Sequence, residues 1–155
     1  MIALNRILVP TDFSENSDVA LKYAMALADL TGASLHVLHV LQNPLGAGWA
    51  AEVYVPPPAE FFERIEQDAR EHLNGLLTDE QKGKYRAELV CLNGSPFLEI
   101  IQFAKQQTID LIVIGTHGRG AVSHMLMGSV AERVVRKAPC PVLTVRHPQH
   151  EFVMP

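Results

Sequence analysis

The stretch best suited to chemistry is a glycine-containing loop that joins an apolar segment to a helical one. Residues 111–114 are consecutive apolar residues, a pattern typical of a strand buried on both faces. Gly115, Gly118 and Gly128 follow, and helical periodicity begins near Ser129. Glycines let the backbone approach a ligand closely, and the start of a helix presents unpaired N–H groups at the positive end of its dipole. The pattern therefore predicts an anion site, most often one for phosphate.

Two side chains strengthen the ligand interpretation. Arg119 adds a guanidinium group to the loop, and Ser129 adds a hydroxyl to the first helical turn. A tight connection without a ligand is the alternative, since glycines are common between strands and helices. The spacing Gly115-x2-Gly118-x9-Gly128-Ser129 is neither the Gly-x4-Gly-Lys-Ser/Thr loop nor the dinucleotide Gly-x-Gly-x-x-Gly loop. The spaced glycines with a basic residue and a serine favour the ligand.

Composition limits the class of protein. With 155 residues, 48% of them apolar and 19% charged, the chain has the size and balance of one globular domain. The net charge of −4 argues against non-specific binding to nucleic acid or to an anionic membrane, and no apolar run approaches the length of a transmembrane helix. The first residues run directly into an expected strand, without the pattern of a signal peptide. Because Cys91 and Cys140 are the only cysteines, we expect reduced thiols and a cytoplasmic protein.

Apolar strands and amphipathic helices alternate along the chain. The expected strands cover residues 7–10, 33–40, 87–92, 111–114 and 142–145. The expected helices begin after Ser14, near Ala59, at Ser95-Pro96 and near Ser129. This order predicts a single α/β domain over residues 1–155. We expect an open, five-stranded parallel sheet of order 3-2-1-4-5, Rossmann-like, with helices on both faces.

Three segments fall outside this alternation. Residues 41–58 are too rich in proline for a helix interior or a central strand. We expect a surface excursion there, a lid or a partner contact, with a simple long loop as the alternative. Residues 78–84 have the composition of a polar turn, and residues 146–155 form a largely polar tail.

The predicted topology brings two loops together. Ligands of an open parallel sheet bind beyond the carboxyl ends of the strands, where the winding reverses, and here that point lies between the first and fourth strands. The first strand ends in Pro10-Thr11-Asp12, and the fourth ends in the glycine loop. Asp12 could merely cap the following turn, but its position directly after the strand favours contact with a ligand.

These motifs occur in an order that resembles the universal stress protein family, in the subgroup that binds ATP. The resemblance covers almost the whole chain. It is carried by residues 6–14, by Ile114-Gly115-Thr116-His117-Gly118, by the helix start Gly128-Ser129-Val130 and by residues 139–145. It implies that the ligand is ATP, whose phosphates could bring Mg²⁺ with them.

The resemblance also implies roles for particular residues. Asp12 would contact the ribose or the adenine side of the pocket, and Val40 would meet the adenine edge through its backbone, while its side chain could be plain core. The ribose and phosphates would lie against Gly115, Gly118, Arg119, Gly128, Ser129 and Val130. The expected nucleotide-binding set is completed by Pro10, Thr11, Thr116 and His117. Arg119 could instead be a solvated charge on the loop.

The histidines do not predict a metal site. His36 and His39 are three residues apart on an expected strand, so their side chains point to opposite faces and cannot share an ion. His117 lies in the glycine loop, where stacking on a ligand or hydrogen bonding to it is reasonable. The cysteines show no zinc spacing. We therefore expect no metal held by protein side chains alone.

No group of residues predicts catalysis. Ser95 is followed by proline, which suits a helix start rather than a nucleophile elbow, and Asp12 is the one carboxylate that can be placed in the crevice. The first hypothesis is a regulatory stress-response protein whose conformation or partners depend on bound nucleotide. The second is a slow ATPase that uses Asp12, Mg²⁺ and water. The third is an interaction module with a vestigial pocket, and the intact glycine spacing argues against it.

The last expected strand predicts a partner. It would lie at the edge of the sheet with open N–H and C=O groups, and it carries no charge that would block pairing. The family resemblance implies that this strand pairs antiparallel with its twin across a two-fold axis, which gives a homodimer. The pairing residues would be Val142, Leu143, Thr144 and Val145.

Overall fold

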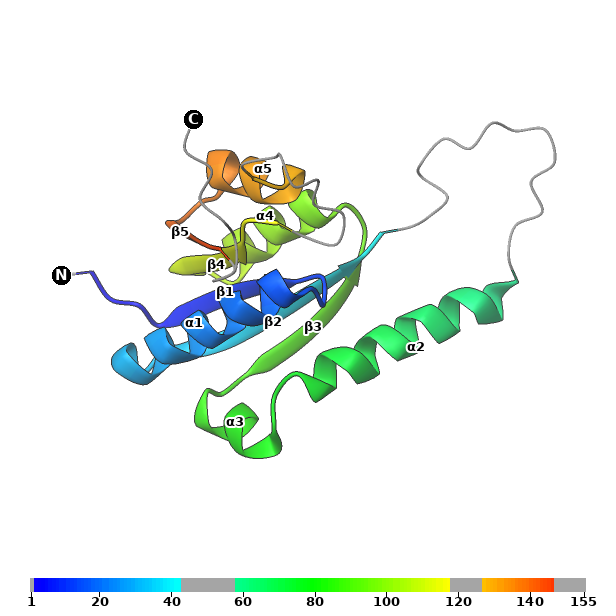
Figure 1. Cartoon of the computed structure of the whole chain (residues 1–155), viewed down its shortest axis with the longest axis horizontal. Helices are drawn as coiled ribbons and strands as arrows, with labels where there is room; N and C mark the ends of the chain where they lie inside the picture. Colours follow the sequence, from blue (N-terminus) through cyan, green and yellow to red (C-terminus); the bar gives the residue numbers. More distant parts are fainter. Residues whose placement is uncertain (1, 43–57, 118–126, 147–155) are drawn as a thin grey trace.

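A parallel sheet forms the centre of the protein in the computed structural model, which describes residues 2–42, 58–117 and 127–146. The five strands have the order β3-β2-β1-β4-β5, and every neighbouring pair is parallel (Figure 1). They are β1 (Arg6–Thr11), β2 (Ser34–Leu41), β3 (Glu88–Asn93), β4 (Leu111–Gly115) and β5 (Val142–Val145). The fold class and strand order predicted from the sequence are therefore confirmed.

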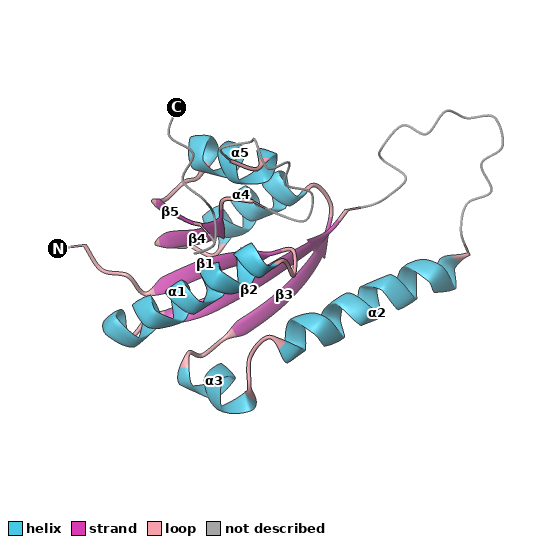
Figure 2. Cartoon of the chain, viewed as in Figure 1, coloured by secondary structure: helices cyan, strands magenta, loops and turns pink. Residues whose placement is uncertain are grey.

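Helices cover both faces of the sheet (Figure 2). Within the described ranges they are α1 (Glu15–Thr31), α2 (Ala59–Gly75), α3 (Asp79–Lys84), α4 (Pro96–Gln106) and α5 (Ser129–Lys137). One hydrophobic cluster joins α1 and α2 to one face, and a second joins α4 and α5 to the other. Crossovers between parallel strands produce this layering, because each connecting helix packs back onto the sheet. No described helix has both the length and the apolar character needed to cross a membrane.

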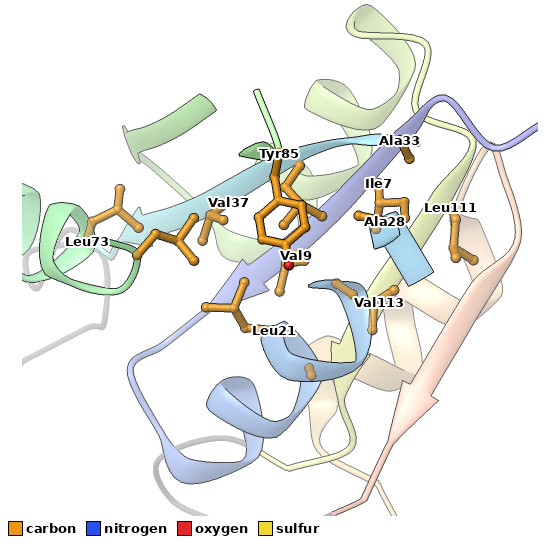
Figure 3. Packing of buried hydrophobic residues seen from close by; sticks show 14 of the residues in the cluster. Ile7, Val9, Leu21, Ala28, Ala33, Val37, Leu73, Tyr85, Leu111 and Val113 are labelled. Atoms are coloured by element: carbon orange, nitrogen blue, oxygen red, sulfur yellow. The ribbon is translucent and has the colours of Figure 1, made fainter. Parts of the chain in front are cut away.

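The alternation of side chains along β1 supplies both cores. Ile7 and Val9 belong to the cluster with α1, Leu8 belongs to the cluster with α4, and all three are fully buried. Figure 3 shows Val9 close to Val37 and Leu21, between the sheet and α1. Burial of one such side chain contributes about 1.5–3 kcal/mol. The carboxyl end of the central strand is therefore held in place by packing on both sides.

The predicted cap at the start of α1 is present, and the end of the helix is capped as well. The Ser14 side chain accepts the Ser17 N–H at 3.3 Å, as an N-cap residue does. Gly32 ends the helix with a φ of 74° and donates its N–H to the Ala28 carbonyl at 2.8 Å. Because residues 12–14 alone join β1 to α1, the cap also fixes the turn that carries Asp12.

Residues 78–84, predicted as a polar turn, instead contain the short helix α3. The reason is a capping box: Thr78 Oγ1 accepts the Gln81 N–H at 3.2 Å, and Gln81 Oε1 accepts the Thr78 N–H at 2.9 Å. This reciprocal pair satisfies donors at the helix start, so a polar sequence becomes helical.

Both ends of the segment predicted as a surface excursion, residues 41–58, belong to or cap regular elements. Leu41 belongs to β2, and Pro58 is the N-cap residue of α2. Residues 43–57 lie outside the described residues, as do residues 147–155 of the predicted tail.

Candidate functional site

A cavity of about 570 Å³ lies beyond the carboxyl ends of β1, β2 and β4, against the starts of α4 and α5. Its lining includes, from the first two strands, Pro10, Thr11, Asp12 and Val40. From β4 and α5 it includes Gly115, Thr116, His117, Gly128, Ser129 and Val130. The loops after the first and fourth strands thus meet at the crevice where the winding reverses. Gly118 and Arg119, the remaining residues of the predicted site, lie outside the described residues.

The turn after β1 is held by its own side chains. Thr11 is buried, and its Oγ1 lies 3.1 Å from Ser17 Oγ and accepts the Phe13 N–H at 3.1 Å. Asp12 Oδ1 accepts the backbone N–H of Ser14 at 3.0 Å and the Ser14 hydroxyl at 2.5 Å. The capping role considered for Asp12 is therefore real, and the same residue also lines the cavity.

Gly115 lies against the first turn of α1. A Cβ built on it would be 3.0 Å from the backbone carbon and oxygen of Asn16, which is tighter than nine in ten Cβ contacts in proteins. The absence of a side chain thus lets the end of β4 pack on α1, in addition to any role toward a ligand. The sequence pattern indicated only the second of these reasons.

Thr116 links the two ends of the glycine loop. It is almost fully buried, its N–H donates to the Val145 carbonyl at 2.9 Å, and its carbonyl accepts the Gly128 N–H at 2.6 Å. Its hydroxyl lies 3.0 Å from Nδ1 of His117. The start of α5 is consequently tied to the carboxyl end of β4, and both lie at the cavity.

Two helix N-termini border the cavity. Gly128 is the N-cap residue of α5 and Ser95 that of α4, and neither makes a side-chain capping hydrogen bond. The first N–H groups of a helix have no acceptor within the helix, and the dipole makes this end positive. Ser129 and Val130 bring such groups of α5 to the cavity, whereas α4 begins there with Pro96, which has no N–H. The arrangement suits an anionic group at the start of α5.

Part of the lining is apolar. Leu38, Ile100 and Ile114 contribute side chains from both layers, and Val40 packs against the same hydrophobic cluster. The Val40 side chain therefore packs against the core, as considered from the sequence. A cavity that combines apolar side chains with the N–H groups of a helix start suits a ligand with an apolar part and an anionic part.

The structure separates His36 from His39 as their spacing predicts. His36 is buried beside Phe103 of α4, and its Nδ1 lies 3.0 Å from Glu88 Oε2, an ion-pair distance without the alignment of a hydrogen bond. His39 lies on the other face, and its Nδ1 is 2.8 Å from the Thr11 carbonyl oxygen. In the described part of the chain, no group of three or more His, Cys, Asp or Glu side chains could hold a metal ion.

Neither cysteine has the environment of a nucleophile. Both Cys91 and Cys140 are free thiols. Burial raises the pKa of the Cys91 thiol, and burial with the nearby Asp110 carboxylate raises the pKa of Cys140. A raised pKa keeps a thiol protonated and unreactive near neutral pH.

Sequence reasoning missed several residues of the lining. His39 and Gln42 come from the end of β2, and Ser17 comes from α1. The position of His39 directly before Val40 was the available signal, because consecutive residues at a strand's carboxyl end both approach the crevice. Ser17 offered no such signal, because a polar residue in the first turn of a helix is ordinarily solvated.

Fold and cavity together define a class: open α/β proteins that bind ligands at the carboxyl edge of a parallel sheet. The family model for the Universal stress protein family matches residues 3–146. The chain belongs to the universal stress protein family.

Individual relatives agree with this assignment. Universal stress protein MJ0531 of Methanocaldococcus jannaschii is 35% identical over 146 residues, which cover 94% of this chain and 84% of that protein. Among solved structures, protein MJ0577 of the same organism matches with a TM-score of 0.74 and 27% identity, over 96% of this chain and 99% of the other. A universal stress protein from Archaeoglobus fulgidus, solved in complex with dAMP, matches with a TM-score of 0.60 and 25% identity. The match covers 94% of this chain and 99% of the other.

Proposed function

We propose that this universal stress protein binds an adenine nucleotide, ATP in the first instance, and that the bound nucleotide regulates its conformation or its partners. One observation carries the proposal. The loops after β1 and β4 meet at one cavity, whose lining combines apolar side chains with the start of α5.

The lining residues fit the parts of such a nucleotide. The adenine would lie against the apolar wall near Val40 and Ile100, and Asp12 would receive ribose hydroxyl groups. The phosphates would lie at the start of α5, where Ser129 offers a hydroxyl and its N–H. The dAMP bound by the Archaeoglobus fulgidus relative supports an adenine nucleotide as the ligand class.

Binding fits this lining better than catalysis. Of the described residues that line the cavity, Asp12 is the only carboxylate, and its Oδ1 already accepts two hydrogen bonds from Ser14. A general base or a Mg²⁺ ligand would have to be made from that single group, whereas efficient phosphoryl transfer uses several placed groups. Mg²⁺ would enter the site bound to the phosphates of ATP. Slow hydrolysis of ATP is the alternative function.

The exposed edge of the sheet supports a second part of the proposal, a homodimer. Among the described strands, β5 is the last of the sheet and pairs with β4 alone, and Leu143 at its centre is 37% exposed. An uncharged edge strand can pair with a second copy of itself. We therefore propose that residues Val142–Val145 form the dimer contact, and that the dimer works in the cytoplasm.

The experiment is to denature freshly purified protein and identify released nucleotides by mass spectrometry, followed by an ATPase assay. Release of ATP, with turnover far slower than the exchange of bound ATP, is the expected result. Rapid turnover that is lost in Asp12→Ala would favour the ATPase. Absence of released nucleotide, together with no binding of added ATP and Mg²⁺, would favour an interaction module.

A further inference from the structure

The residue after Asp12 has an unfavourable backbone conformation. Phe13 has a φ of 62°, in the left-handed region that bulky side chains rarely occupy. Such a conformation persists only where the surroundings hold it in place. Phe13 lies in the short turn between β1 and α1, so its conformation determines the path of the chain just past Asp12.

Two imidazole rings hold the Phe13 side chain. The His39 ring, from the end of β2, is stacked on it with centroids 4.2 Å apart and planes at 29°. The His72 ring, from the last turn of α2, is stacked with centroids 4.2 Å apart and planes at 6°. Two rings cannot both occupy one face of a phenyl group at that separation, so Phe13 lies between them.

Hydrogen bonds join the same residues to the chain on either side of Asp12. The His39 Nδ1–H donates to the Thr11 carbonyl, since a carbonyl oxygen can only accept. The Phe13 N–H donates to Thr11 Oγ1. Asp12 is thus flanked by two residues that His39 contacts directly, and its own carboxylate is held by Ser14.

We infer that Phe13, held between His39 and His72, is a positioning residue that keeps Asp12 in the cavity wall. Asp12 and His39 line the cavity, whereas Phe13 and His72 do not. His72 on α2 thereby becomes a determinant of ligand affinity without contacting the ligand. This inference rests on the proposed nucleotide site for its effect on affinity, but not for its effect on the Asp12 turn.

The variant His72→Ala removes one face of the stack at an exposed helical position where alanine preserves the helix. Because this variant loses one aromatic stack, we expect its affinity for ATP with Mg²⁺ to fall about two- to tenfold. Because the effect passes through Asp12, the same change in an Asp12→Asn background should have little further effect. His72→Phe restores a ring and should restore affinity, and Asn74→Ala is the matched control on the same helix.

The test combines calorimetric titration of ATP with NMR measurement of amide hydrogen exchange at Ser14, whose N–H is bound by Asp12 Oδ1. We expect faster exchange at Ser14 and weaker ATP binding in His72→Ala, and wild-type behaviour in His72→Phe and Asn74→Ala. Unchanged exchange at Ser14 in His72→Ala would overturn the inference, whether or not the protein binds ATP. Faster exchange in a protein that binds no ATP would uphold the positioning of Asp12 and reject the proposed function.

Discussion

Gly115 lies so close to Asn16 that a Cβ on it would be 3.0 Å from the Asn16 carbonyl carbon and oxygen. The contact sets the end of β4 directly on the first turn of α1, and it brings the two site loops within reach of one ligand. Gly115 therefore has a packing role in the fold in addition to its proposed role in the nucleotide site.

Replacing Gly115 should damage stability first. Gly115→Ala places a methyl group against backbone that cannot move away easily, and we expect a loss of about 1–3 kcal/mol in the free energy of unfolding. Gly83→Ala is the control, because a Cβ at Gly83 in α3 meets nothing within 4 Å. Urea denaturation should show Gly83→Ala to be as stable as wild type or slightly more so. Equal stability of all three proteins would contradict the packing role of Gly115.

Two substitutions of Asp12 should separate its effect on ATP binding from its effect on folding stability. Asp12→Asn keeps an oxygen that can accept from Ser14 but removes the charge, so we expect weaker ATP binding, by roughly tenfold, with little change in stability. Asp12→Ala removes the acceptor as well and should also cost about 1 kcal/mol in stability. Calorimetric titration and thermal unfolding measure the two effects. If Asp12→Asn bound ATP as tightly as wild type, the charge of Asp12 would have no role in ATP binding.

The edge strand β5 should control the oligomeric state. Leu143→Lys places a charge at the centre of the exposed edge and should convert the proposed dimer to a monomer. Light scattering after size-exclusion chromatography gives the mass directly. Leu30→Lys is the control, since Leu30 is 83% exposed at the end of α1. A dimer that survives Leu143→Lys would place the interface elsewhere.

The thiols should be slow to alkylate. Because burial raises the pKa values of Cys91 and Cys140, less thiolate is present at a given pH than in a free cysteine. The rate of reaction with iodoacetamide should be low near neutral pH and rise only above the ordinary thiol pKa of about 8.5. The unfolded protein should react faster at the same pH. Equally fast reaction of the folded protein near neutral pH would contradict the environment described for the thiols.

The sequence predicted the sheet because its signals are local and repeated. Apolar runs marked each strand, and the cap at Ser14 marked the start of α1. Strand order then followed from alternation, and it placed Asp12 beside Gly115. The capping box of Thr78 and Gln81 was also local, but the helix that it starts is too short to show periodicity.

Contacts between distant segments could not be predicted in this way. The Phe13 stack takes one ring from the first turn, one from β2 and one from α2, and no spacing along the chain relates them. The packing of Gly115 on Asn16 likewise depends on how β4 meets α1. Such contacts follow from the packed arrangement of the elements, so only the structure shows them.

The most direct test of the central claim is titration of ATP with Mg²⁺ into wild type and Ser129→Pro. Proline is well tolerated at the first helical position, and Gly128, with φ of −68° and ψ of 150°, already has the conformation favoured before proline. The change removes an N–H and a hydroxyl from the proposed phosphate site. Asp79→Pro likewise removes the N–H of a first helical residue, at the start of α3 and away from the cavity.

We expect wild type and Asp79→Pro to bind ATP alike, and Ser129→Pro to bind it roughly tenfold or more weakly at unchanged thermal stability. Equal ATP affinity in all three proteins would contradict a phosphate site at the start of α5, and no binding by the wild type would contradict the nucleotide site itself.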